Sequence, residues 1–390
     1  MIVRYGKENE KKFAIEHWKN SFKDSNEQIE FYFNNIFNHK NYLILEKDKK
    51  IISSLHENPY ILNFNNNEIK TKYIVGVSTP IEEQRKGYMT HLLTEMLKNS
   101  KEKNYPFIFL TPINPNIYRK FGFEYFSKIE NFKLKIEDLK NFKIDRTLNF
   151  YEIDINNKDK YLNDLIFIYN KAMKTKFLYL KRDEYYFNKL LLECFNDGMK
   201  IFISYKNNEP QGYIFFSKTD NEIEVRELFS IDFKIYESLL ALLYFYKDYY
   251  QELNISTASN SNIEYIFENQ LKIKKTEYPF MMMRVLKPLE IFKLLDIKIE
   301  NLKIQIEDEI FKDNTGLYLY NKKWQYSSKS VADYDFKINI NDFTSLVTGF
   351  FSFDEMLFMK KIELNINKKV KIEKLREIFK RKQNYLYEFQ

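Results

Sequence analysis

The spacing of hydrophobic residues changes repeatedly along this 390-residue chain, and no other feature restricts its fold as strongly. Between residues 42 and 77 they form short runs separated by charged, proline and asparagine turns, which is typical of strands. Between 87 and 99 they recur every three or four positions, which is typical of an amphipathic helix. One or two helices are expected over 12–37, and a buried strand over 106–110. These patterns predict an α+β fold, in which a largely antiparallel meander precedes a strand–helix–strand crossover.

The pattern divides the chain into three units. The first, residues 1–140, ends with strands near 123–126 and 132–134. The second, residues 141–287, repeats the order of the first, which indicates an internal structural repeat. The third, residues 288–390, opens with strands and closes with helices at about 341–350, 353–360 and 371–380. Since no proline-rich or low-complexity linker separates them, we expect packed domains.

Composition excludes several classes of protein. Hydrophobic residues make up 44% of the chain and charged residues 30%, a globular profile. A net charge of +7 spread over this length forms no strongly basic stripe, so nucleic-acid binding is not expected. No run approaches the roughly 20 apolar residues of a membrane span, and no secretory leader is visible. We therefore expect a cytoplasmic protein with no membrane partner.

Cysteine and histidine usage points away from disulfide and metal chemistry. The single cysteine, Cys194, cannot form an intramolecular disulfide, and its helix-like apolar surroundings favour a core residue over a nucleophile. None of the four histidines stands at a zinc-like spacing from another ligand, so no metal site is expected.

Residues 75–90 carry the first chemical signal. A predicted strand enters a loop with Arg85, Lys86 and Gly87, and a helix follows at once. Glycine lets the backbone approach a ligand closely, and the unpaired amides at a helix start attract anions such as a pyrophosphate. Such a loop alone also fits an ordinary solvated strand-to-helix turn. A second signal follows the next strand, where Tyr118 begins a Tyr-x-x-x-Gly-Phe element that ends at Phe123.

Together the two elements resemble the GNAT acetyltransferase superfamily. In that family a Gln/Arg-x-x-Gly-x-Gly/Ala loop holds the pyrophosphate of coenzyme A, and residues 84–89 correspond to it, with Met89 in place of the usual small residue. Within the superfamily the whole chain is most similar to the Eis family. The resemblance implies two GNAT-type mixed sheets with flanking helices, the second in a degenerate domain, followed by a sterol-carrier-protein-like α+β domain.

The resemblance also implies which residues act. The backbone of the strand end would hold the pantetheine arm, the loop and helix start would bind the pyrophosphate, and the loop before the tyrosine would line the thioester end. In chain order these cofactor residues are Val77, Ser78, Thr79, Arg85, Lys86, Gly87, Tyr88, Met89, Thr90, Ile113 and Asn114. Tyr118 would be the general acid that protonates the departing thiolate. In Eis enzymes the C-terminal carboxylate enters the active site as a base, and here it belongs to Gln390.

The expected function is acetyl-CoA-dependent N-acetyltransfer to a primary amine of an aminoglycoside, a polyamine or a lysine side chain. An alkyl amine with a pKa near ~10.4 must lose a proton before it attacks a thioester, so the reaction needs a base and an acid but no covalent nucleophile. The resemblance further implies a homo-oligomer, such as a hexamer. The alternative is a non-catalytic protein with a lipid or small-molecule cavity in its C-terminal domain. A peptidyl-transferase relative that uses aminoacyl-tRNA is disfavoured by the lack of a basic stripe.

Overall fold

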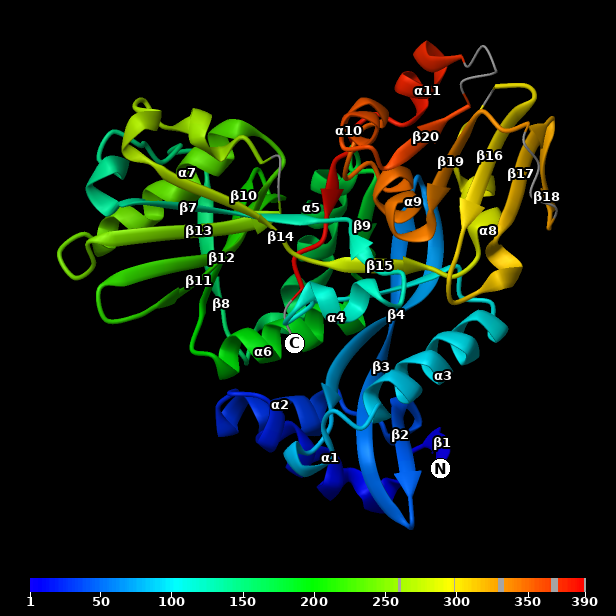
Figure 1. Ribbon diagram of the computed structural model, residues 1–390. Coiled ribbons are helices and arrows are strands. Elements are labelled where there is room, and N and C mark those ends of the chain that lie inside the picture. Colours follow the sequence, from blue (N-terminus) through cyan, green and yellow to red (C-terminus); the bar gives the residue numbers. More distant parts are fainter. Residues whose placement is uncertain (259–260, 298, 329–332, 366–370, 389–390) are drawn as a thin grey trace.

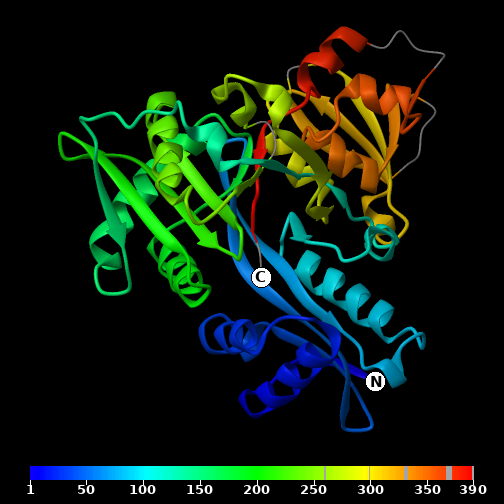
Figure 2. The same ribbon diagram turned by 90° about the vertical axis from the view of Figure 1, so that its left-hand side faces the viewer.

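The computed structural model describes residues 1–258, 261–297, 299–328, 333–365 and 371–388 (Figure 1). Within these ranges the strands form three mixed sheets, of nine, seven and five strands. Helices flank each sheet, and the C-terminal segment runs through the middle of the molecule (Figure 2). The predicted α+β class, with two mixed sheets followed by a third α+β unit, is confirmed.

The first sheet, together with the helices and loops that adjoin it, holds most of the predicted site. Its strands in spatial order are β1 (Ile2–Tyr5), β2 (Tyr42–Lys47), β3 (Lys50–Phe64), β4 (Asn67–Ser78), β5 (Phe107–Leu110), β15 (Met282–Val285) and β6 (Glu124–Tyr125), while β9 (Leu178–Leu180) pairs with β3 and β21 (Asn384–Tyr385) pairs with β9. Helices α1 (Lys11–Ser21) and α2 (Asn26–Asn35) pack on one face, and α3 (Tyr88–Glu102) packs on the other.

Alternation along β4 explains why both faces are covered. Tyr73 lies in the core that includes Trp18 of α1, whereas its neighbour Ile74 lies in the core that includes Leu92 and Leu93 of α3. Successive strand residues point to opposite faces, so a strand that is apolar at consecutive positions needs a helix on each side. Trp18 is 4% exposed and is therefore a core residue.

Strand β3 corrects one expectation. The sequence suggested that Pro59 separates two strands, but β3 runs unbroken from Lys50 to Phe64. On the side opposite β4, its pairing with β2 reaches His56 and its pairing with β9 begins only at Leu62. Pro59 therefore lies on a locally open edge, where the missing N–H costs no ladder hydrogen bond.

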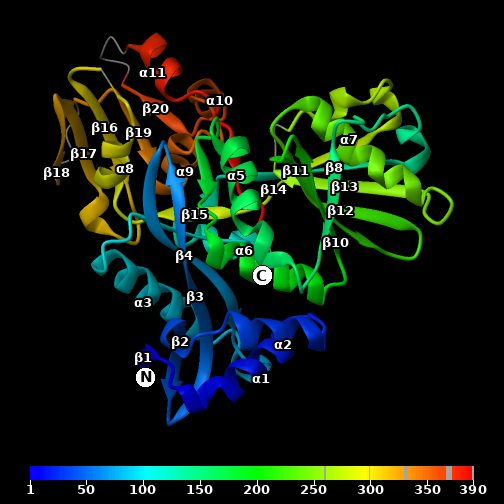
Figure 3. The ribbon, with the colours of Figure 1, turned by 180° about the vertical axis from the view of Figure 1, so that it is seen from behind.

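The second sheet repeats the plan of the first. Its strands in spatial order are β14 (Lys274–Pro279), β7 (Lys128–Lys135), β13 (Glu252–Ala258), β12 (Glu222–Ser230), β11 (Glu209–Lys218), β10 (Lys200–Lys206) and β8 (Asn149–Ile153), with helices α5 (Leu162–Met173), α6 (Glu184–Asn196) and α7 (Phe233–Leu243). Strands β12 and β13 pair in parallel across α7, as β4 and β5 do across α3. Helix α2 packs against α6 and joins the two units (Figure 3).

The third sheet is smaller. Its strands in spatial order are β18 (Lys323–Ser327), β17 (Gly316–Asn321), β16 (Leu302–Glu307), β19 (Phe336–Asn339) and β20 (Ile362–Leu364), with helices α8 (Pro288–Leu294), α9 (Ile340–Val347), α10 (Phe353–Phe358) and α11 (Ile372–Ile378). Aromatic side chains fill its interior: the Phe292 ring stacks on Trp324 at 4.1 Å and lies 5.0 Å from the Phe343 ring.

Strands cross between the units. Strand β7, inside residues 1–140, belongs to the second sheet, whereas β9 and β15 from the second unit and β21 from the third belong to the first sheet. Strand β15 lies between β5 and β6, where Met282 and Met283 are fully buried, as is Met281 directly before the strand.

The described residues show neither a membrane-spanning helix nor a metal cluster. None of their helices is long and apolar enough to cross a membrane. No three of their His, Cys, Asp or Glu side chains are grouped so that they could hold a metal ion. Cys194 is buried, as expected for a core residue.

Candidate active site

The end of β4 has an open edge. Strands β4 and β5 pair over only two positions, Tyr73 with Phe109 and Ile74 with Leu110. Strand β4 then continues to Ser78, whereas β5 ends at Leu110. Past Ile74 no described strand pairs with this side of β4. Its backbone groups can therefore hydrogen-bond to an extended chain that carries amides.

A bulge at Gly76 shapes this edge. The pairing with β3 shifts register there, and Gly76 adopts a φ of +61°. A Cβ at this position would come within 2.6 Å of the Trp18 ring. Only glycine suits both the left-handed backbone and the close ring, so α1 and the bulge fix each other.

Hydroxyl groups of β3 fix the last residues of β4. The Ser53 hydroxyl donates to the Ser78 carbonyl at 2.9 Å and lies 2.9 Å from the Thr79 hydroxyl. The Ser54 and Ser78 hydroxyls are 3.1 Å apart, and Ser54 lies 3.1 Å from Nδ1 of His17. Burial lowers the pKa of His17. The strand end predicted to hold pantetheine is thus held from the β3 side and open on the other.

The start of α3 is exposed and uncapped. Gly87 occupies the N-cap with a φ of +83°, and no described side chain caps the helix. A Cβ built on Gly87 meets no atom within 4 Å, so the space beside this residue is open. Arg85 and Lys86 are exposed beside it, with Lys86 3.1 Å from the Glu83 carboxylate. Uncapped helix amides and nearby cations favour an anion, so this corner is the candidate pyrophosphate site.

The first residues of α3 divide between core and surface. Met89 packs against the core beneath α3, so its side chain leaves the corner free. Tyr88 also borders this core, and its hydroxyl accepts a hydrogen bond from Nζ of Lys47 at 2.8 Å. Thr90 is exposed.

Tyr118 lies in α4 (Pro115–Arg119), which Asn114 caps by accepting the Asn116 N–H at 3.0 Å. Ile113 before it is 79% exposed. Tyr118 is 8% exposed, and its hydroxyl hydrogen-bonds to no other described residue. Burial raises the pKa of Tyr118 to about 12, so the phenol is protonated at neutral pH. Val77, Tyr88, Met89 and Tyr118 all border one core, which brings strand, helix and tyrosine together.

Family models match three stretches of the chain. Acetyltransferase (GNAT) domain models match residues 2–126 and 178–285, and a sterol carrier protein domain model matches residues 285–387. The chain belongs to the GNAT acetyltransferase superfamily. It is an N-acetyltransferase of that superfamily, and its order of two GNAT domains and a sterol carrier protein domain confirms the resemblance to the Eis family.

Solved structures with this fold span the full chain. A probable N-acyltransferase from Enterococcus faecalis V583 superposes with a TM-score of 0.86 at 15% identity, and covers 100% of this chain and 99% of its own. A GCN5-related N-acetyltransferase from Anabaena variabilis gives 0.84 at 15% identity, and Eis1 from Mycobacterium abscessus gives 0.79 at 12%, each with full coverage of both chains. At these identities the likeness shows the fold alone. No curated protein sequence matches the chain significantly.

The C-terminal tail of this GNAT protein is buried from residue 384 to residue 388, and Gln390 lies outside the described residues. Glu388 is 5% exposed, and its carboxylate accepts hydrogen bonds from Arg182, at 3.2 Å, and from the Tyr186 hydroxyl. Arg182 also binds Glu227 at 2.7 Å. Burial raises the pKa of Glu388, and Arg182 opposes that shift. No local pattern in the sequence singles out this cluster, because its members come from three distant segments.

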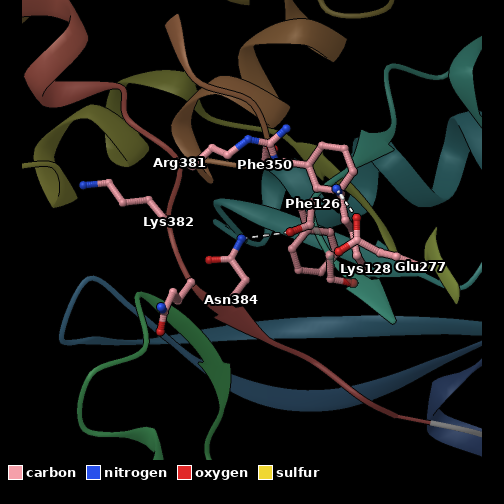
Figure 4. Close-up of a pocket in the computed structure, with 10 residues that line it drawn as sticks. Phe126, Lys128, Glu277, Phe350, Arg381, Lys382 and Asn384 are labelled. Atoms are coloured by element: carbon pink, nitrogen blue, oxygen red, sulfur yellow. Dashed lines mark hydrogen bonds and ion pairs between the residues drawn. The ribbon is translucent and has the colours of Figure 1, made fainter. Parts of the chain in front are cut away.

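A pocket of about 230 Å³ lies where the three domains meet (Figure 4). Asn384 of the tail donates to the Phe126 carbonyl at 2.8 Å and the Thr348 carbonyl at 2.9 Å, and Lys128 pairs with Glu277 at 2.6 Å. None of the predicted cofactor residues lines this pocket. We therefore interpret this pocket as part of the interface that holds the C-terminal tail.

Proposed function

We propose that this GNAT N-acetyltransferase moves the acetyl group of acetyl-CoA to a primary amine by direct attack. The observation that carries the proposal is the corner at Gly87, which is open and uncapped beside the free edge of β4. A pyrophosphate suits the uncapped helix start at Gly87, and the amides of a pantetheine arm suit the free edge of β4.

The residues present fit the cosubstrate. In the proposal Gly87 and the amides of Tyr88, Met89 and Thr90 receive the pyrophosphate, and Arg85 and Lys86 add positive charge. The backbone from Val77 to Thr79 receives the pantetheine arm. Ile113 and Asn114 lie before α4, so the thioester end would face Tyr118.

Tyr118 supplies the acid in this proposal. When the amine nitrogen bonds to the thioester carbon, the carbon–sulfur bond breaks and negative charge develops on sulfur. The buried phenol donates its hydrogen bond, and then its proton, to that sulfur. The amine gives up its own proton to a base, for which the family resemblance suggests the Gln390 carboxylate. No covalent enzyme intermediate is needed.

The binding-protein alternative finds less support. A lipid cavity needs empty apolar space in the C-terminal domain, whereas Phe292, Trp324 and Phe343 pack against one another there. The acceptor stays open among aminoglycosides, polyamines and lysine side chains. The family resemblance also supports a cytoplasmic homo-oligomer. Sedimentation velocity of the purified protein tests the oligomeric state directly.

Release of free thiol from acetyl-CoA, measured across polyamines, aminoglycosides and lysine peptides, tests the activity and identifies the acceptor. With the best acceptor, Tyr118→Phe is expected to lower kcat by about 10²–10⁴-fold, while the Kd for coenzyme A stays unchanged. Tyr105→Phe is the matched control, because Tyr105 borders the same core but lies outside the site. Equal turnover by wild type and Tyr118→Phe would refute the acid role, and no thiol release with any amine would refute the proposed reaction.

A further inference from the structure

The turn that follows Tyr118 is held by a side chain of the sterol carrier protein domain. Asn341, in the first turn of α9, donates from Nδ2 to the Arg119 carbonyl at 2.9 Å and to the Phe123 carbonyl at 3.0 Å. Since both acceptors are carbonyl oxygens, only the NH₂ group of the amide can face them. One side chain therefore bridges the two ends of the turn from another domain.

A buried ion pair supports the same turn. Arg284 of β15 is fully buried, and its Nη2 lies 2.8 and 2.7 Å from the two oxygens of Asp308, which directly follows β16. The guanidinium packs directly against Gly122: a Cβ there would lie 2.4 Å from Nη1 and 2.6 Å from Cζ. Asp308 also accepts the Phe311 N–H at 3.0 Å and Nδ2 of Asn314 at 2.8 Å, so the pair is itself fixed.

The backbone links this turn to Tyr118. The Tyr118 carbonyl accepts the N–H groups of Phe121 at 2.9 Å and Phe123 at 3.4 Å. The Gly122 N–H donates to the Arg119 carbonyl at 3.0 Å. Any shift of the turn therefore shifts the tyrosine that the turn closes on.

Helix α4 cannot supply this rigidity alone. It has five residues, and isolated helices of this length do not form in water. A buried ion pair is weak evidence for stability, because desolvation offsets most of the attraction, but it fixes geometry wherever both partners are held. The contacts to the turn are thus suited to setting position.

We propose that Asn341 and the Arg284–Asp308 pair are positioning residues that hold the Tyr118 hydroxyl at the reacting thioester. The C-terminal domain thereby sets the turnover of the N-terminal GNAT domain without contacting substrate through these residues. The inference rests on the acid role proposed for Tyr118.

The test uses full-length protein and variants at three positions, Asn341, Asp313 and Tyr118. Asn341→Asp removes both donors at nearly constant shape, and a carboxylate in the first turn of α9 favours the helix. Asn341→Ala removes the donors without adding charge, and Asn341→Gln keeps an amide. Asp313→Asn is the matched control, because it weakens a 2.7 Å contact between Lys101 of α3 and the same domain at a carboxylate that is 72% exposed. The Asn341 changes are also made in the Tyr118→Phe background.

We expect Asn341→Asp and Asn341→Ala to lower kcat by about 10- to 100-fold, with the KM for acetyl-CoA unchanged, and Asn341→Gln to recover part of the loss. In the Tyr118→Phe background the same changes should have no further effect, because the group they position is gone. Asp313→Asn should keep full kcat.

Three results would overturn the inference. The first is a normal kcat for both Asn341→Asp and Asn341→Ala, and the second is an equal loss of kcat from these changes in the wild-type and Tyr118→Phe backgrounds. The third is an equal loss of kcat in Asp313→Asn, accompanied by a lower unfolding midpoint of the variants. A normal rate for Tyr118→Phe would refute the acid role and this inference with it. A slow Tyr118→Phe beside normal Asn341 variants would refute this inference only.

Discussion

Two glycines with nearly the same positive φ allow the packing beneath Tyr118 to be measured. Gly87 and Gly122 have φ values of +83° and +81°. An added Cβ at Gly87 meets nothing within 4 Å, whereas at Gly122 it meets the Arg284 guanidinium at 2.4 Å. Because both alanine variants adopt the same unfavourable backbone, the difference in their unfolding free energies isolates the contact with Arg284.

The magnitude follows from the two terms. A left-handed backbone costs an L-residue roughly 1–2 kcal/mol, and this loss is common to both variants. Arg284 is fully buried and held by Asp308, so it cannot move aside, and overpacking of this kind costs about 1–3 kcal/mol. Gly87→Ala should therefore lose about 1–2 kcal/mol and Gly122→Ala about 2–5 kcal/mol.

Urea unfolding followed by circular dichroism and by tryptophan fluorescence gives both values. Trp18 reports on the N-terminal domain and Trp324 on the C-terminal domain. Gly122→Ala should also lower kcat, because the displaced turn carries Tyr118. Equal destabilisation by the two substitutions would show that Arg284 yields freely, and the packing argument would fail.

Two further predictions concern buried titratable groups. Burial lowers the pKa of His56 to about 3, below the ~6.5 of an unfolded chain, so the stabilisation from neutral His56 is full above pH ~6.5 and is lost as the pH falls toward 3. His56→Gln should therefore reduce the slope of the unfolding free energy against pH between pH 3 and 6.5 by up to about 1.4 kcal/mol per pH unit. An unchanged slope would exclude His56 as its source. Burial raises the pKa of the Cys194 thiol to about 12, so an aromatic disulfide that labels thiols should react with Cys194 only after unfolding. Rapid labelling of the native protein would contradict the assignment of Cys194 as a buried core residue.

The sequence correctly predicted those elements whose structure depends on residues close together in the chain. The spacing of Leu92, Leu93, Met96 and Leu97 predicted a helix over 87–99, and α3 spans Tyr88–Glu102 with Gly87 at its N-cap. Gly87 could be recognised because a glycine at a helix start beside two basic residues is a pattern of only a few consecutive residues. The roles of Val77, Gly87 and Tyr118 in chemistry remain predictions.

Contacts between distant segments could not be read from the sequence. Arg284 and Asp308 are 24 residues apart, and Arg182 meets Glu388 across 206 residues. Neither pair belongs to a local motif, and one sequence carries no signal that couples such positions. Strand β15 illustrates the same limit: its burial follows from three consecutive methionines, but its insertion between β5 and β6 depends on the folded domains around it.

The exchange of strands between domains has a consequence for synthesis on the ribosome. Residues 384–385 pair with β9, which in turn pairs with β3 of the first sheet. Residues 282–285 fill the gap between β5 and β6. The N-terminal domain leaves the ribosome before the other two but cannot complete its sheet until residues 384–385 have been made, and meanwhile its unpaired strand edges are open to wrong partners. A stop codon before residue 384 would therefore damage the first sheet, most of which is made early.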